Sequence, residues 1–310
     1  MKTAFLFSGQ GAQYPGMMLD VVDAYSEARE VFHVAKEVLG RDLYTEIGQM
    51  SQNELDQTLN TQPCMLVCEL AVLRVLRAQG IPYDAVAGFS LGEWAAVVAA
   101  DVLQESDAIR MIACRAEAMQ RAVPIGKGGM AYMLGKDDRF VAHFCEEVGG
   151  VAPANYNIQG NVSVAGTAEG IECFLERGER EGLLVGRIPV SIPSHCWLMK
   201  SAVEELTPLI RTLEMKPSQM PLLMNATGRK AAGLTEIKNN LAMQLTHPVQ
   251  FRQIVDTLLL EGFDAFIEAG PGNTLSKMIK KAAKQRGCTV CIMQAGRLED
   301  IEKIKVTYGL

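Results

Sequence analysis

Ser90 lies in a Gly-x-Ser-x-Gly motif, Gly88–Gly92, that follows the apolar run Ala85–Ala87 and precedes an alanine-rich segment. A short strand, a sharp turn and a helix in this order are typical of a nucleophile elbow, which exposes the serine hydroxyl above the end of the strand. The two glycines suit a tight turn whose backbone passes close to neighbouring elements. A βα turn with an idle serine is the alternative, but the strand and helix on either side favour Ser90 as a nucleophile.

A serine hydroxyl needs a base to remove its proton, and the chain has four histidines. His33 and His143 lie in predicted helices, which favours structural roles. His247 precedes a proline in a predicted loop and is compatible with either role. His195 follows Pro193-Ser194 in an irregular segment at a predicted domain junction, where sites are often built. We therefore expect His195 to be the general base. The sequence singles out no acid to orient it, and a carbonyl can also hold the imidazole tautomer.

The apolar run 2–7 ends at a glycine-rich turn, Ser8–Gln13. A dinucleotide-binding turn would have its third glycine where this chain has Tyr14, so that fingerprint fails. The turn would instead place its backbone at the C-terminal end of a strand, where α/β proteins bind ligands. Its amide groups are candidates for stabilising the negative charge that develops in a reaction.

The composition bounds the class of protein. The chain has 310 residues, 48% of them hydrophobic and 21% charged, and a net charge of -6. This length can bury a large core, and the negative charge disfavours a nucleic-acid partner. The N-terminal apolar stretch is too short for a signal peptide, and no run is long enough to span a membrane. The eight cysteines are scattered along the chain, and without an export signal they predict reduced thiols in the cytoplasm and no metal site.

Hydrophobic periodicity predicts alternating strands and helices. The expected helices cover residues 20–39, 64–79, 91–100, 107–123, 137–147, 168–180, 197–213, 235–244, 249–262 and 274–285. The expected strands cover residues 2–7, 85–88, 130–134, 151–155, 161–165, 184–190, 222–225, 264–268 and 289–293. The βαββαβ order of 130–190 is that of a ferredoxin-like unit. We expect an α/β fold in which an α/β-hydrolase-like domain with a mostly parallel sheet (1–125 and 191–310) carries an inserted ferredoxin-like domain (126–190).

The chain resembles the malonyl-CoA:acyl-carrier-protein transacylases and the acyltransferase domains of polyketide synthases. The resemblance covers essentially the whole chain and rests on several motifs in the family's order. These motifs are Gly9–Gln13, Gly88–Glu93, Arg115-Ala116, Asn155–Asn157, Val190–Cys196, Pro248–Gln250 and Gly270–Gly272. Together they are specific, whereas any one of them alone is not.

The resemblance implies a role for each matching position. Ser90 would carry the acyl group as an ester, and His195 would act first as general base and then as general acid. The backbone amides of Gln10 and Leu91 would form the oxyanion hole. Arg115 would bind the free carboxylate of a malonyl group through two hydrogen bonds, whereas its spacing alone favours a surface arginine whose stem covers apolar side chains. The further pocket residues would be Gln10, Gln13, Asn155 and Asn157.

The resemblance also assigns the group that orients the base and exposes one departure. In the family a carbonyl near the Pro-Val-Gln segment holds the histidine. The residue that corresponds to this carbonyl here is Gln250, and such a carbonyl would account for the missing acid. The family usually has histidine before the nucleophile, where this chain has Phe89. Phenylalanine makes no conventional hydrogen bond, so the change bears on pocket polarity and acyl selectivity. Because the nucleophile, base and arginine are intact, we expect activity to persist, including in a specialised pathway such as antibiotic synthesis or malonate decarboxylation.

The implied activity is ping-pong transfer of malonyl from malonyl-CoA through Ser90 to the phosphopantetheine thiol of a holo acyl carrier protein. A Ser-His dyad would catalyse it in the cytoplasm without a metal or redox cofactor, in fatty acid or polyketide synthesis. The expected enzyme is a monomer with no nucleic-acid or membrane partner. The family's carrier is acidic, so this net-negative chain would need a local basic patch to attract it. The candidates are Arg187, Lys200 and the segment Lys277–Arg286.

Two other classes of function remain open at this point. A serine hydrolase such as a thioesterase shares the elbow but has no need of Arg115. A non-catalytic subunit that binds the carrier has no need of Ser90 or His195, so their presence counts against it.

Overall fold

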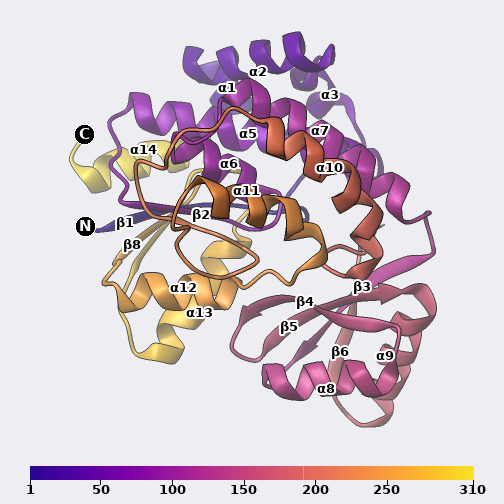
Figure 1. The fold of residues 1–310 in the computed structure, drawn as a ribbon. Coiled ribbons are helices and arrows are strands. Elements are labelled where there is room, and N and C mark those ends of the chain that lie inside the picture. Colours follow the sequence, from indigo (N-terminus) through magenta and orange to yellow (C-terminus); the bar gives the residue numbers. More distant parts are fainter. Residues whose placement is uncertain (191) are drawn as a thin grey trace.

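The computed structural model describes residues 1–190 and 192–310 and contains two separate sheets (Figure 1). Ser191, which belongs to the predicted Val190–Cys196 motif and begins the second expected part of the large domain, lies outside the described residues. The larger sheet has five strands in the order β7-β2-β1-β8-β9, and all of its pairings are parallel. Its strands are β1 (Thr3–Phe7), β2 (Ala85–Gly88), β7 (Leu222–Leu223), β8 (Ala265–Glu268) and β9 (Cys291–Gln294). The predicted α/β class is confirmed.

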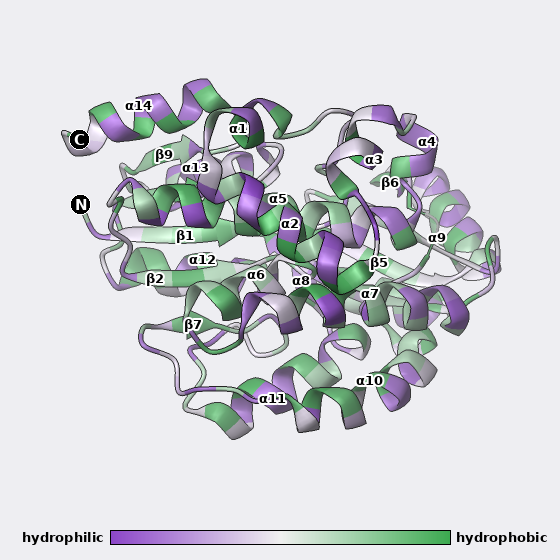
Figure 2. Cartoon of the chain, turned by 90° about the horizontal axis from the view of Figure 1, so that it is seen from above, coloured by the Kyte–Doolittle hydropathy of each residue, from purple (hydrophilic) through white to green (hydrophobic). Residues whose placement is uncertain are grey.

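The parallel sheet is buried on both faces. Successive side chains of its strands point to opposite sides, and helices cover each side. Phe5 and Phe7 of β1 belong to the larger core cluster, whereas Ala4 and Leu6 belong to a second cluster on the other face. Helices α5 (Thr58–Ala78), α6 (Gly92–Ala99) and α7 (Glu105–Ala122) contribute to the first cluster. Helices α12 (Phe251–Leu260) and α13 (Thr274–Arg286) contribute to the second. Figure 1 shows β1 and β2 between α5 and α6 on one side and α12 and α13 on the other, and Figure 2 shows these two strands as largely hydrophobic.

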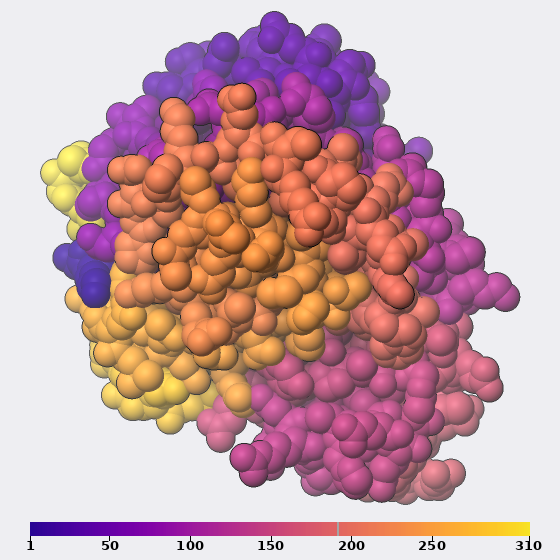
Figure 3. Space-filling model, in the orientation of Figure 1, coloured from indigo at the N-terminus to yellow at the C-terminus, as the bar shows by residue number. Residues whose placement is uncertain are grey.

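The second sheet is antiparallel and has four strands in the order β4-β5-β3-β6. Its strands are β3 (Gly128–Leu134), β4 (Val151–Ile158), β5 (Asn161–Thr167) and β6 (Leu184–Ile188). Helices α8 (Asp138–Val148) and α9 (Ala168–Arg180) pack on it, and together they bury a core of their own. Figure 3 shows this part of the chain gathered in one lobe at the lower right. The predicted βαββαβ order is found, while the division into domains at 126 and 190 stays a prediction.

The remaining helices lie in the N-terminal third and the C-terminal half of the chain. They are α1 (Leu19–Ala24), α2 (Ser26–Leu39), α3 (Leu43–Gln49), α4 (Gln52–Leu55), α10 (Lys200–Thr212), α11 (Leu234–Met243) and α14 (Leu298–Tyr308), with 3-10 turns η1 (Trp197–Met199) and η2 (Gln244–Thr246). By length and composition α5 would be able to cross a membrane, but 83% of its apolar window is buried inside the protein. Its apolar side chains belong to the larger core cluster.

Several helical segments differ from the sequence-based expectation, and the short helices α3 and α4 were not expected at all. The helix expected at 20–39 is broken at Tyr25, whose backbone is extended (φ -119°, ψ 126°). Helix α5 begins at Thr58, six residues before the apolar spacing that predicted it, because its first turns carry mostly polar residues. Helix α14 was not expected, since it buries only Ile301 and Ile304 and therefore shows a weak apolar stripe.

The turn that carries Ser90 packs directly against the end of β1. A Cβ on Gly92 would overlap the carbonyl oxygen of Phe7, and one on Gly88 would overlap the backbone of Gly92 itself. The amide of Phe89 donates a hydrogen bond to the Phe7 carbonyl at 2.9 Å. The elbow is therefore locked to β1 by backbone contacts that exclude any side chain at the two glycines.

We predict that Gly92→Ala lowers the free energy of unfolding by about 3 kcal/mol or more, because backbone atoms rather than a flexible side chain must move to admit the methyl group. The measurement is the midpoint of chemical denaturation. Gly48→Ala is the matched control, because Gly48 lies exposed in α3 and its Cβ would meet only Leu19 Cδ1 at 3.4 Å. That variant should gain up to about 1 kcal/mol from helix propensity. Equal midpoints for the two variants would contradict the packing argument.

Candidate active site

Ser90 and His195 form a hydrogen-bonded pair at the C-terminal end of β2. His195 Nε2 lies 2.7 Å from Ser90 Oγ, and the histidine is almost completely buried. Both residues have a left-handed backbone, with φ values of 54° and 63° respectively. Non-glycine residues rarely adopt this conformation, and such strain tends to collect at functional sites. The structure thus brings together the nucleophile and base that the sequence predicted.

Two backbone carbonyls hold the other ring nitrogen of His195. Its Nδ1 lies 3.0 Å from the Gln244 oxygen and 3.2 Å from the His247 oxygen. Because both partners are acceptors, Nδ1 must carry the hydrogen, which leaves Nε2 free to accept the serine proton. The assignment of this role to Gln250 is wrong. The Gln250 carbonyl instead accepts a hydrogen bond from the Ile254 amide at 3.0 Å.

The charge state of His195 follows from its surroundings. Burial lowers the pKa of His195 to about 4, and the nearby charge of Arg115 acts in the same direction. The hydrogen bonds to the Gln244 and His247 carbonyls oppose this shift without cancelling it. The imidazole is therefore neutral at pH 7, which is the form that a general base requires.

Arg115 is buried in the site, so the surface position that its spacing favoured is wrong. Its Nη2 donates to Ser90 Oγ at 3.1 Å and to Gln244 Oε1 at 3.0 Å, and its Nη1 donates to Gln62 Oε1 at 2.6 Å. Burial lowers the pKa of Arg115 to about 10, which keeps the guanidinium charged at pH 7. Its Nε has no partner among the described residues. The guanidinium thus retains hydrogen-bonding capacity beside the nucleophile.

A buried polar network under the elbow was missed by the sequence analysis. The side chain of Gln244 donates to the Ser90 carbonyl at 2.9 Å and to the carboxylate of Glu93. Glu93 also accepts from the Asn225 amide, and Asn225 in turn accepts from the Ser90 amide at 2.6 Å and donates to the Gly88 carbonyl at 2.7 Å. Burial raises the pKa of Glu93 to about 7. The one available signal was a glutamate three residues after Ser90 in an otherwise apolar helix.

Gln10 and Leu91, the two residues whose amides were expected to form an oxyanion hole, lie at the site. Both residues line the pocket around Ser90. Among the described residues neither amide donates a hydrogen bond, whereas the Ser90 amide is already engaged by Asn225. Two unpaired donors at this position can stabilise an oxyanion. Their role in catalysis stays a prediction.

The pocket around Ser90 is small and lies between the two sheets. Its volume is about 80 Å³, the room of roughly three water molecules. Its lining is Gln10, Phe89, Ser90, Leu91, Arg115, Met119, Met130, Asn155, Ile188, Val190, Ile192, Ser194 and His195. Mostly apolar walls around one arginine fit a short acyl group that carries a negative charge.

Of the other residues that were predicted to line the pocket, one does so and two do not. Asn155 lines the pocket, and its Oδ1 has no partner among the described residues. Gln13 is not part of the lining, because its side chain bonds Asp56 and the Gly11 amide, both at 2.7 Å. Asn157 is not part of it either, since its Nδ2 bonds Asn161 and Ser163 within the β4–β5 hairpin. Their assignment to the pocket is corrected accordingly.

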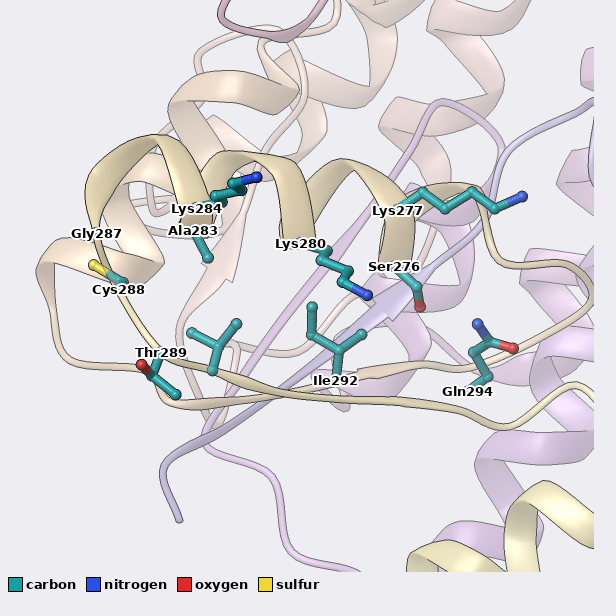
Figure 4. Close-up of a pocket in the computed structure, with 11 residues that line it drawn as sticks. Ser276, Lys277, Lys280, Ala283, Lys284, Gly287, Cys288, Thr289, Ile292 and Gln294 are labelled. Atoms are coloured by element: carbon teal, nitrogen blue, oxygen red, sulfur yellow. The ribbon is translucent and has the colours of Figure 1, made fainter.

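A larger hollow of about 780 Å³ lies between α13 and β9 and shares no lining residue with the Ser90 pocket. Figure 4 shows Lys277, Lys280 and Lys284 along its helical wall and Ile292 and Gln294 on its strand. It holds no nucleophile and base in contact, so the smaller pocket is the candidate active site.

The chain is similar to a family of known proteins and to several solved structures. Residues 4–306 match the family model described as the acyl transferase domain. The chain is 36% identical to a malonyl CoA-acyl carrier protein transacylase of Bacillus subtilis, over 92% of this chain and 91% of the relative. It is similar to a crystal structure of FabD from Acinetobacter baumannii (TM-score 0.93, 32% identity, 99% and 98% of the two chains). It is also similar to a malonyl-transacylase in complex with a type II polyketide synthase acyl-carrier protein (TM-score 0.94, 31% identity, 99% and 100%).

We predict that the rate of Ser90 acylation stays level as the pH falls through 6.5, the ordinary pKa of histidine, because only the neutral form of His195 accepts a proton and its pKa is about 4. The rate should then decline as the pH approaches 4. The measurement is single-turnover acylation against pH. Glu93, with a pKa of about 7, titrates within this range, so Glu93→Gln is measured in parallel. A decline near pH 6.5 that persists in Glu93→Gln would contradict the assigned state of His195.

Proposed function

This chain belongs to the acyl transferase family, and from that membership we propose that it transfers malonyl from malonyl-CoA to the phosphopantetheine thiol of an acyl carrier protein. The observation that carries the proposal is the contact of Ser90 Oγ with both His195 Nε2 and Arg115 Nη2 in a small pocket. A nucleophile, a neutral base and a buried cation at one point suit a negatively charged acyl donor.

In the first half of the ping-pong cycle, Ser90 Oγ attacks the thioester carbonyl while His195 Nε2 takes its proton. The amides of Gln10 and Leu91 donate to the carbonyl oxygen as it becomes negative. The carbon–sulfur bond then breaks, and the coenzyme A thiolate takes the proton from the imidazolium. Malonyl remains on Ser90 as an ester.

In the second half, the carrier's thiol gives its proton to His195 and attacks the malonyl ester. The bond to Ser90 Oγ breaks, and the serine regains its proton from the imidazolium. Asn225 and Gln244 hold the Ser90 backbone throughout, so the nucleophile keeps its place in both halves. A Ser-His dyad oriented by carbonyls is therefore sufficient for the proposed reaction.

Arg115 selects donors that carry a free carboxylate in this proposal. It would form a two-pronged, charge-assisted contact with the distal carboxylate of malonyl, and the Nε without a protein partner supports this capacity. Asn155, with its unpartnered Oδ1, would contribute from the antiparallel sheet. A simple thioesterase would not need this buried charge, which favours the transferase.

The carrier would approach a basic surface of this net-negative chain. Among the described residues Lys277, Lys280 and Lys284 make no ion pair, whereas Arg187 pairs with Glu172 and Lys200 with Glu204. The three unpaired lysines line the hollow of Figure 4 and suit an acidic partner. The complex of a similar malonyl-transacylase with its acyl-carrier protein supports such a partner.

The proposal extends to the fold and the setting of the enzyme. The elbow at the end of a parallel sheet supports an α/β-hydrolase-like domain, and the antiparallel order β4-β5-β3-β6 supports a ferredoxin-like insert. Free cysteines at all eight positions support action in the cytoplasm. We propose a monomer that needs no metal or redox cofactor and has neither a nucleic-acid nor a membrane partner.

We predict that brief incubation with malonyl-CoA adds one malonyl group to the intact protein, that the group is on Ser90, and that holo carrier protein removes it and gains the same mass. Mass spectrometry of both proteins is the measurement, and Ser90→Ala should show no adduct. An adduct lost to water while the carrier stays unmodified would identify a hydrolase instead.

We predict that Arg115→Ala lowers the rate of malonyl loading by about 10- to 100-fold relative to acetyl loading, since a hydrogen bond to a charged group contributes about 1.5–3 kcal/mol. The ratio of the two rates cancels any common effect on Ser90 and His195. Arg110→Ala is the matched control, because Arg110 lies exposed on the same helix and pairs with Asp107. Equal losses with both donors would rule out the carboxylate contact.

A further inference from the structure

Phe89 lies between the Ser90 pocket and a second cavity. The second cavity has a volume of about 90 Å³ and lies between the Ser8–Ala12 turn and the start of α13. The two cavities share only Gln10 and Phe89 among the residues that line them. These two residues therefore form the partition between the acyl pocket and the space behind it.

Of these two residues, only Phe89 has a side chain whose shortening would connect the two cavities. The side chain of Gln10 is held by Thr58, whose Oγ1 donates to its Oε1 at 3.0 Å. The ring of Phe89 makes no hydrogen bond and packs edge-on against Phe251 at 5.3 Å. It also lies over Gly9, where a Cβ would come within 2.9 Å of Phe89 Cδ1. The ring is thus held in place by packing alone.

The chemistry of the second cavity suits an alkyl group. Its walls include Leu275, Met278 and Ala12 beside the glycine backbone of the turn. The Ser8 hydroxyl is already used, since it donates to Glu268 at 3.0 Å. A volume of about 90 Å³ accommodates roughly three atoms of carbon size, judged by the volume of a water molecule. The cavity would therefore receive a short alkyl chain rather than a polar or charged group.

We propose that Phe89 determines the acyl specificity of this enzyme by closing the pocket around Ser90 against this apolar cavity, so that donors with a bulky alkyl substituent on the α-carbon are rejected. The inference rests on the proposed malonyl transfer. Shortening the side chain at this position joins the two cavities, and the alkyl branch of a 2-alkylmalonyl group then enters the space behind the wall.

The test compares the acylation of Ser90 by malonyl-CoA, ethylmalonyl-CoA and butylmalonyl-CoA in the wild type and in Phe89→Ala. The expected result is a rise of at least about 10-fold in the ratio of kcat/KM for butylmalonyl-CoA to that for malonyl-CoA, in line with the effect of one or more methylene groups in an apolar pocket. Adding Met278→Phe to Phe89→Ala should refill the cavity and reverse most of the gain. Phe89→Leu, a milder truncation, should show a smaller rise and serves as the test if the alanine variant does not fold.

Phe140→Ala is the matched control, because it removes the same atoms from the exposed face of α8. For Phe140→Ala the ratio of kcat/KM for butylmalonyl-CoA to that for malonyl-CoA should equal the ratio of the wild type. The inference is overturned if a folded Phe89 variant is still malonylated on Ser90 with an unchanged ratio, or if Phe140→Ala raises the ratio equally. Failure of the proposed function looks different, since the wild type itself would then take no malonyl group from malonyl-CoA.

Discussion

The close approach of the Ser90 turn to the end of β1 is the constraint on which the rest of the site depends. Only glycine fits at Gly88 and Gly92, because any side chain would overlap the backbone of Phe7 or of the turn itself. This contact places the loop after β1 directly beside the start of α6. Gln10 and Leu91 consequently line one pocket although they come from distant parts of the chain. The strained backbone is stable because a parallel sheet that is buried on both faces holds both strands.

Gln244 connects the three functional groups of the site through different atoms. Its backbone oxygen orients His195, its side-chain oxygen accepts from Arg115, and its side-chain nitrogen donates to the Ser90 carbonyl. The carboxylate of Glu93 accepts a hydrogen bond from the side-chain amide of Gln244 and another from the backbone amide of Asn225. Buried polar groups are costly unless they are fully paired, so such a network favours one arrangement over all others. The geometry of the dyad is thus set by residues that need not touch the substrate.

The sequence predicted those parts of the site that have a local signature. The strand-turn-helix pattern identified Ser90, and elimination among four histidines identified His195. Gln244 and Asn225 are separated from Ser90 by 154 and 135 positions in the sequence, although both form hydrogen bonds with it. The hydrophobic periodicity of a sequence gives no information about such distant contacts. A carbonyl that orients a histidine has no side-chain signature either, which is why the assignment to Gln250 failed. Likewise, helical spacing placed Arg115 beside an apolar face without indicating that another element covers it.

The use of carbonyls rather than a carboxylate to orient His195 fits a negatively charged substrate. An aspartate at this position would raise the pKa of His195, but it would also repel a carboxylate that approaches Arg115. Neutral dipoles leave the charge of Arg115 free for the substrate, at the cost of a less basic imidazole, whose pKa is about 4. The same guanidinium lies 3.1 Å from Ser90 Oγ, and in the proposed reaction it would stabilise the oxygen as its proton leaves. One buried cation would thereby assist the nucleophile while adding to the effect of burial, which is the main cause of the low pKa of His195.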